Sequence, residues 1–265
     1  PTKTEQSDLM QAMYGRNGEA PLAIVAPMSP SDCFYTMLEA VRISVEHMIP
    51  VMFLSDGYLA NGSEPWRFPK ADELSTIHPR FADPTKTHEG DYLPYKRNAD
   101  LVREWAIPGM EGLQHRVGGL EKENETGNVS YDPDNHELMV KIRQEKVNLI
   151  AQDIPDQELT LGDATAKILV LGWGGTYGSI RTAVRDLIAQ GHSVSQAHIR
   201  HLNPFPKNLG DLLAQFDQIL VPEINNGQLV NIINATYHLN AIPLNKIKGM
   251  PFTSKEIKER ILELI

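Results

Sequence analysis

The sequence holds a single cysteine, Cys33, in 265 residues. One thiol cannot close an internal disulfide, which suits a reducing cytoplasm. It also cannot supply the roughly four thiolates that an iron–sulfur cluster needs, so any such cluster would have to sit on a partner. Cys33 falls inside an apolar helical pattern, and this position favours a buried structural thiol over a nucleophile.

Long apolar runs and an excess of basic residues are also missing. No run approaches the ~20 residues that a membrane span needs, and no secretory signal is visible. Lysine and arginine number 25 against 34 acidic residues, which gives a net charge of −9. A chain that binds nucleic acid would normally carry a basic face. We therefore expect neither a membrane nor a nucleic acid as partner, and the length predicts one large or two ordinary domains.

Several catalytic motifs are absent as well. The nine histidines form no H-E-x-x-H pair, so no metal site is predicted, and no G-x-S-x-G elbow indicates a serine hydrolase. The glycine run 172–178 lies between a predicted strand and a predicted helix, where free N–H groups could hold an anion. It matches neither the dinucleotide fingerprint nor a P-loop. A tight turn that lets helix and strand pack closely is the better interpretation.

A strand, a helix and a second strand are predicted in the first part of the chain. The apolar run 22–26 ends at Pro27 and is typical of a buried parallel strand. Ser29 is expected to cap a helix, whose apolar side follows from three- and four-residue spacing. That side would carry Phe34, Met37, Leu38, Val41, Val45 and Met48. Because residues 51–54 form the next strand, a right-handed parallel crossover is the default topology.

The rest of the chain divides into an irregular and a regular part. Residues 58–131 show no sustained period and are predicted to wrap the surface or to form a functional insertion. A helix follows over 132–150, with Leu138, Ile142 and Leu149 on one side, and 153–156 is interpreted as a linker. Beyond it, strands are expected at 168–171, 193–199, 218–221 and 242–244, and helices over 180–188, 209–216, 229–239 and after the Thr253/Glu256 capping box. Alternating strands and helices predict an α/β fold.

Three polar segments are candidates for function. The opening stretch, Pro1–Leu9, is dense in short polar side chains and contains Thr2 and Lys3. Residues 223–228 follow the carboxyl end of a predicted strand, where ligands of open α/β sheets bind. Glu223 there could bind a hydroxyl or amine, or pair with a neighbouring subunit. In the irregular part, Arg116 could clamp a carboxylate bidentately, although a surface salt bridge is the more common use.

These segments also carry a resemblance to a known family. The chain is similar to the C-terminal part of the α subunit of 2-oxoacid:ferredoxin oxidoreductases, most of all the 2-oxoglutarate branch. Pro1–Leu9 resembles the stretch that follows a Gly-Pro-Ser-Thr-Gly loop in that family, and Gly18–Pro21 continues it. Further similar segments are Arg116–Glu121, Leu202–Pro206 and Glu223–Leu229. The sequence departs from the family pattern at Gly118, where threonine is usual, and at Lys122, where histidine is usual, and this puts the role of that turn in doubt.

The resemblance implies a thiamin diphosphate enzyme. Its expected reaction is the oxidative decarboxylation of a 2-oxoacid, with coenzyme A taking the acyl group and ferredoxin the electrons. It further implies that a separate β subunit binds the diphosphate, Mg²⁺ and the iron–sulfur cluster. The glutamate that activates the cofactor would precede Pro1. The chain also begins without an initiator methionine, so we expect it to be a piece of something longer and inactive alone, with no catalytic residue of its own.

The resemblance also implies a division of the chain and a set of contacts. Residues 1–152 would be the rear of a thiamin-type pyrimidine-binding domain, a parallel sheet with helices and a long insertion. Residues 153–265 would be a transketolase-C-terminal-like α/β domain that packs subunits together, with Glu223, Asn225, Gly227 and Gln228 as structural or interface residues. Thr2, Lys3 and Arg116 are the expected substrate contacts.

Partners and alternatives complete these expectations. The implied assembly is a homodimer of αβ pairs located in the cytoplasm. The same chemistry on pyruvate or a branched-chain 2-oxoacid is one alternative, and a non-catalytic assembly module is another.

Overall fold

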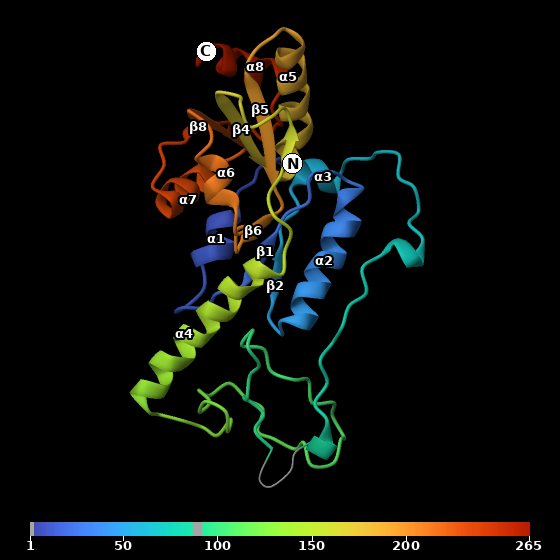
Figure 1. The fold of residues 1–265 in the computed structure, drawn as a ribbon, viewed down its shortest axis with the longest axis vertical. Coiled ribbons are helices and arrows are strands. Elements are labelled where there is room, and N and C mark those ends of the chain that lie inside the picture. Colours follow the sequence, from blue (N-terminus) through green and yellow to red (C-terminus); the bar gives the residue numbers. More distant parts are fainter. Residues whose placement is uncertain (1–2, 87–91) are drawn as a thin grey trace.

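The computed structural model describes residues 3–86 and 92–265, and Figure 1 shows how their elements are arranged. Its strands are β1 (Ala23–Val25), β2 (Val51–Phe53), β3 (Leu159–Leu161), β4 (Ile168–Trp173), β5 (Val194–Ile199), β6 (His201–Asn203), β7 (Gln218–Glu223) and β8 (Ile242–Asn245). They form a three-stranded sheet of order β2-β1-β6 and a five-stranded sheet of order β3-β5-β4-β7-β8.

Helices connect these strands and confirm the predicted α/β class. The α-helices are α1 (Leu9–Tyr14), α2 (Asp32–Glu46), α3 (Gly57–Ala60), α4 (Pro133–Leu149), α5 (Tyr177–Ala189), α6 (Leu209–Leu213), α7 (Gln228–Tyr237) and α8 (Ser254–Leu262). Short 3₁₀ turns lie at Ala71–Glu73, Pro84–Lys86, Ile150–Gln152 and Gly174–Thr176. The capping box predicted for the last helix is present, with Thr253 accepting from the Glu256 N–H. No helix within the described residues is long and apolar enough to cross a bilayer.

The small sheet contains the predicted crossover and one strand that the sequence did not indicate. β1 and β2 are parallel and are joined by α2, as expected. On its other side, β1 pairs antiparallel with β6, where Ile24 is aligned with Asn203. β6 comes from the segment assigned to the second domain, so strands from both sides of the predicted boundary share this sheet. The division at residues 152 and 153 stays a prediction.

The apolar side predicted for α2 is wrong. Phe34, Met37 and Val41 are 39%, 44% and 43% exposed. The helix instead buries Ala40 and Ile43, which pack in a core with β1 and the end of α4. A small side chain such as that of Ala40 lets the helix lie close to the strand, and the bulkier side chains are left facing outward.

The five-stranded sheet lies between two layers of helix. β4 shows the alternation: Leu169 and Leu171 join a core with residues of α1, α6 and α7, whereas Ile168 and Val170 join a second core with residues of α5 and α8. All its pairings are parallel except the edge pairing of β3 with β5. A mostly parallel sheet covered on both faces explains why its central strands β4 and β7 contain continuous apolar runs.

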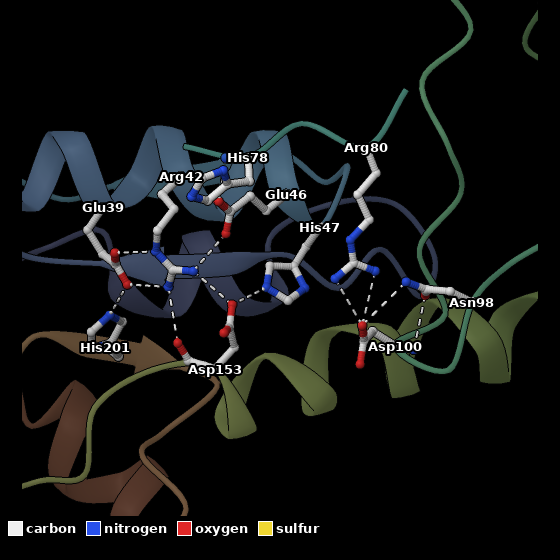
Figure 2. Close-up of polar contacts among 10 residues, drawn as sticks. All are labelled: Glu39, Arg42, Glu46, His47, His78, Arg80, Asn98, Asp100, Asp153 and His201. Carbon is white, nitrogen blue, oxygen red and sulfur yellow. Dashed lines mark hydrogen bonds and ion pairs between the residues drawn. The ribbon is translucent and has the colours of Figure 1, made fainter. Parts of the chain in front are cut away.

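A network of charged side chains ties α2 to the segment predicted as a linker (Figure 2). The Arg42 guanidinium lies 2.8 Å from a Glu39 oxygen and 2.7 Å from an Asp153 oxygen. His47 Nε2 lies 2.9 Å from the same Asp153 oxygen, and His201 Nε2 lies 3.2 Å from Glu39 Oε1. Arg42 is only 13% exposed, so its ion pair with Asp153 is partly shielded from water. This ion pair and the contact with His47 fix residue 153 to the helix.

The segment 58–131 is mostly irregular, as predicted, and much of it lies at the end of the molecule away from the amino terminus (Figure 1). Isolated bridges such as Phe81–Trp105 and Tyr95–Glu125 hold it together. The Trp105 indole N–H donates to the Val45 carbonyl over 2.9 Å and attaches the segment to α2.

Candidate functional site

The amino-terminal stretch enters the edge of the five-stranded sheet through Gln6, which is 3% exposed. Its side-chain Nε2 donates to the Trp173 carbonyl over 2.7 Å. Its Oε1 accepts from the Ile224 N–H over 2.9 Å, and its own N–H donates to the Ile224 carbonyl over 2.9 Å. Gln6 therefore bridges the carboxyl ends of β4 and β7.

This position is the ligand crevice of the sheet. In open α/β sheets the crevice lies at the carboxyl ends of two neighbouring strands whose connections leave in opposite directions. β4 continues through α5 to β5 on one side, and β7 continues through α7 to β8 on the other. In this chain the crevice holds a side chain of the same chain.

A small polar cleft of about 110 Å³ opens beside Gln6. Its lining comes from three places: the amino-terminal stretch, the loop after β2 and the end of β4. The lining residues are Glu5, Gln6, Ser7, Asp8, Phe53, Leu54, Ser55, Asp56 and Trp173. The cleft brings the carboxyl end of the small sheet against that of the large sheet, and it is the candidate functional site.

Asp56 closes the glycine turn from inside this cleft. Its carboxylate accepts from the Tyr58 and Leu59 N–H groups over 2.9 and 3.1 Å and so caps α3. Its other oxygen accepts from the Gly175 N–H over 2.7 Å. The N–H that an anionic ligand would use is therefore bound to Asp56. The structure confirms the tight turn, and this turn does not fit a diphosphate.

Glu223 is fully buried and bonded within its own chain. Its carboxylate accepts from the Trp173 indole N–H, from the Asn225 amide and from the Leu229 and Val230 N–H groups, over 2.8 to 3.1 Å. The last two donors belong to the first turn of α7, where a negative charge is stabilising. The carboxylate thus serves an internal helix end here, and a contact with a neighbouring subunit stays a prediction.

The residues after Glu223 hold the amino-terminal stretch. Asn225 donates to the Gln6 carbonyl over 2.9 Å, and its Oδ1 accepts from the Gly227 N–H over 2.7 Å. The Gln228 side chain accepts from the Met10 N–H and donates to the Ser7 carbonyl, each over 2.8 Å. Gly227 adopts φ +81°, which favours glycine. The segment 223–228 therefore fixes residues 6–10 on the large sheet.

The structure does not bring the expected substrate contacts together. Thr2 lies outside the described residues. Lys3 is exposed, and its side chain lies beside Gly249. Arg116 is exposed and has no hydrogen bond or ion pair within the described ranges. It belongs to the irregular segment 58–131, much of which lies at the end of the molecule away from the amino terminus (Figure 1). The turn after Arg116 is held by buried Lys122, whose ammonium donates to the Gly118 and Leu120 carbonyls over 3.1 and 2.6 Å.

Metal ligation finds little support in this part of the chain. Within residues 3–86 and 92–265 no group of three or more His, Cys, Asp or Glu side chains is suited to a metal ion. Burial, together with the charges of Asp32 and Asp56, raises the pKa of the Cys33 thiol, which keeps it protonated. The residues present thus do not fit Mg²⁺ or a cluster, and the assignment of both to a partner subunit stays a prediction.

Sequence reasoning missed Gln6 and Asp56 as parts of the site. Asp56 had a usable signal, because a Ser-Asp-Gly loop directly follows a predicted strand. Gln6 had none beyond its place in a polar stretch, since its partner Trp173 lies 167 residues further along the chain.

Comparisons with known proteins agree along nearly the whole chain. Residues 1–132 match the family described as pyruvate flavodoxin/ferredoxin oxidoreductase, thiamine diphosphate-binding, and residues 166–259 match pyruvate:ferredoxin oxidoreductase core domain II. The chain is 48% identical to the 2-oxoglutarate oxidoreductase subunit KorA of Mycobacterium tuberculosis, over 97% of this chain and 39% of that protein. It is 28% identical to the 2-oxoglutarate synthase subunit KorA of Methanothermobacter marburgensis, over 86% of this chain and 60% of that protein.

A solved structure has the same fold. The 2-oxoglutarate:ferredoxin oxidoreductase from Magnetococcus marinus, solved with 2-oxoglutarate, coenzyme A and succinyl-CoA bound, superposes with a TM-score of 0.92 and 31% sequence identity. The match covers 99% of this chain and 46% of that one. The chain thus spans less than half the length of this structure and of the mycobacterial relative.

Proposed function

This chain belongs to the 2-oxoacid:ferredoxin oxidoreductase family, and we propose that it is part of an α subunit that acts on 2-oxoglutarate. The complete enzyme would convert 2-oxoglutarate and coenzyme A to succinyl-CoA and carbon dioxide and pass two electrons to ferredoxin. The observation that carries this proposal is the 48% identity to a 2-oxoglutarate oxidoreductase subunit along 97% of the chain. Since the chain spans 39% of that relative, the activity is assigned to the complete enzyme and the piece alone is expected to be inactive.

The division of labour follows from the residues that are present. Residues 1–152 would form the rear of the pyrimidine-side domain, and residues 153–265 the second α/β domain. The diphosphate, Mg²⁺ and the iron–sulfur cluster would be held by a β subunit, which is supported by the lone cysteine and by the occupied glycine turn. Two αβ pairs would form the enzyme, located in the cytoplasm, with coenzyme A and ferredoxin as further partners.

The substrate carboxylates are assigned to Thr2, Lys3 and Arg116. Lys3 is exposed three residues before Gln6, and its side chain lies beside Gly249. Arg116 has an unpaired guanidinium within the described residues, and this group suits bidentate binding of a carboxylate. Because this chain alone does not bring Lys3 and Arg116 together, a joint role requires a second subunit.

The test of function is viologen reduction by the full-length α subunit with its β partner, supplied with thiamin diphosphate, Mg²⁺ and coenzyme A. Reduction with 2-oxoglutarate that depends on coenzyme A is expected. Reduction with pyruvate or a branched-chain acid instead would keep the chemistry and change the substrate. Discrimination between such acids can depend on about 1–3 kcal/mol in one pocket. Absence of reduction with every 2-oxoacid would favour a non-catalytic assembly module.

Lys3→Ala tests the substrate contact in the same assay. Loss of one ammonium that binds the substrate carboxylate should raise the KM for 2-oxoglutarate about tenfold or more, with a smaller change in kcat. Lys255→Ala is the matched control, because its side chain is 81% exposed on α8 and its one ion pair within the described residues is with Glu259 of the next turn. Unchanged kcat and KM in Lys3→Ala would refute this role.

A further inference from the structure

We propose that Gln6 is the positioning residue for the substrate-binding stretch. Its side chain takes the place of a ligand in the crevice of the five-stranded sheet and thereby anchors the stretch at the polar cleft, three residues after Lys3. The inference rests on the proposed function, because it assigns a purpose to a stretch that is expected to contact substrate.

The first argument is that every polar atom of Gln6 is bonded. The side-chain amide donates to Trp173 and accepts from Ile224, the backbone N–H donates to the Ile224 carbonyl, and the Gln6 carbonyl accepts from Asn225. One of these bonds joins Gln6 to Trp173 at the end of β4, and three join it to Ile224 and Asn225, directly after β7; all are buried. Breaking the bond to Ile224 would leave a buried backbone N–H without this acceptor, which is costly. Breaking the bond to Trp173 would leave its carbonyl with the Thr176 hydroxyl as donor, 2.8 Å away, and would remove the bond that joins Gln6 to the end of β4.

The second argument is that the glycine turn is shaped to admit this side chain. A Cβ at Gly174 would lie 2.7 Å from Gln6 Nε2, and Gly174 adopts φ +56°. Any other residue there would be strained and would displace the amide. The turn that follows β4 therefore leaves room for Gln6 on one side while its Gly175 N–H binds Asp56 on the other.

The third argument is that the firmly held part of the amino-terminal stretch begins at Gln6. Beyond it, Gln228 holds Ser7 and Met10, and Leu9 is fully buried. Before it, Lys3 is exposed and the nearest backbone contact is a long one, from the Thr4 N–H to Gly249 at 3.4 Å. Gln6 is thus the last firm attachment, about 10 Å of chain from Lys3.

Only an amide satisfies both partners. The Trp173 carbonyl can be reached from Gln6 only by a donor, in addition to the Thr176 hydroxyl that also donates to it, and the Ile224 N–H needs an acceptor. An ionised glutamate offers acceptors alone, and leucine offers neither group. Gln6→Leu should therefore release the stretch fully, and Gln6→Glu should lose the bond to Trp173 and keep the bond to Ile224.

The experiment combines hydrogen exchange with kinetics on the complete enzyme. In Gln6→Leu, the amides of residues 4–8 should exchange at least about tenfold faster while those of α5 are unchanged. The KM for 2-oxoglutarate should rise about tenfold, and kcat should change less than about threefold. Gln6→Glu should show smaller changes in the same direction, and it keeps the test decisive where the leucine variant does not fold. The matched control is Gln196→Leu, a fully buried glutamine of β5 whose side chain has no hydrogen bond within the described residues.

Three results would overturn the inference. One is unchanged exchange over residues 4–8 in both variants. Another is faster exchange with an unchanged KM in an enzyme that turns over 2-oxoglutarate, which leaves the proposed function intact. The third is an unaltered enzyme that turns over no 2-oxoacid, in which case the proposed function fails and the positioning role fails with it. Because exchange is measured without substrate, these results are distinguishable.

Discussion

At the scale of single residues, Glu223 is a fully buried carboxylate with four N–H donors beside the candidate site, and it yields a direct prediction. All its donors are N–H groups, so Glu223→Gln would place an amide –NH₂ against a donor and remove the charge at the α7 terminus. We expect a loss of about 2–4 kcal/mol in the free energy of unfolding. Urea unfolding at pH 7 measures it, with exposed Glu158→Gln as control, for which a change below about 0.5 kcal/mol is expected. Equal stability of the two variants would contradict this role.

The sequence predicted part of this site for a physical reason. Polar residues directly after an apolar run, as in 223–228, lie at the carboxyl end of a strand, and that position can be recognised locally. What those residues contact cannot be recognised in the same way. Glu223 pairs with Trp173 and Asn225 with Gln6, residues 50 and 219 positions away, and no local pattern encodes such distances.

At the scale of elements, the glycine turn after β4 and the start of α5 permit a comparison between two nearby glycines. A Cβ at Gly175 would lie 2.4 Å from the Asp56 carboxylate, whereas a Cβ at Gly178 in α5 meets nothing within 4 Å. Gly175→Ala should therefore destabilise the chain by about 1–3 kcal/mol through overpacking. Gly178→Ala should be neutral or stabilise it by up to about 1 kcal/mol, because alanine is the better helix former. Chemical unfolding of both variants checks this, and similar effects of both would mean that the turn is not closely packed.

Elements with strong local signals were predicted well, and those defined by partners were not. α8 has its capping box, and β4 and β7 contain the continuous apolar runs Ile168–Leu171 and Ile219–Val221. β6 (His201–Asn203) and β3 (Leu159–Leu161) are three residues each, and each is a strand only because a distant strand pairs with it. The buried side of α2 was wrong for a related reason. Periodicity marks apolar positions, but the close approach to β1 selected Ala40 and Ile43 and left Phe34, Met37 and Val41 outside.

At the scale of the whole molecule, the two predicted domains share their cores. One hydrophobic cluster contains Leu9 and Ile24 together with Leu169 and Leu229, so it spans the boundary drawn from sequence. The β1–β6 pairing, the Gln6 bridge and the Arg42 network cross it as well. Composition could locate the acidic stretch 153–156, but it could not show that Asp153 is held by α2. We therefore expect the two parts to stabilise one another.

The Arg42 network makes this mutual stabilisation sensitive to acid. Burial opposes ionisation of Glu39, but the hydrogen bonds and charges of Arg42 and His201 outweigh it and lower the pKa of Glu39 to about 2. Asp153 behaves similarly: burial opposes its ionisation, and Arg42 and His47 lower its pKa. A carboxyl group with a folded-state pKa below its unfolded value of about 4.3 stabilises the fold above that value, and this stabilisation is lost as the pH falls toward 2.

The prediction is a pH-dependent difference between the unaltered chain and Glu39→Gln. At pH 7 the unaltered chain should be more stable by up to about 3 kcal/mol, and about half of this difference should remain at pH 3. Urea unfolding at pH 7, 5 and 3 provides the measurement, and exposed Glu19→Gln should follow the unaltered chain throughout. Because Glu39 of the first predicted part contacts His201 of the second, the loss should be seen equally by probes in residues 1–152 and in residues 153–265. A difference that does not change with pH, or that affects one part alone, would show that the network does not unite the two parts.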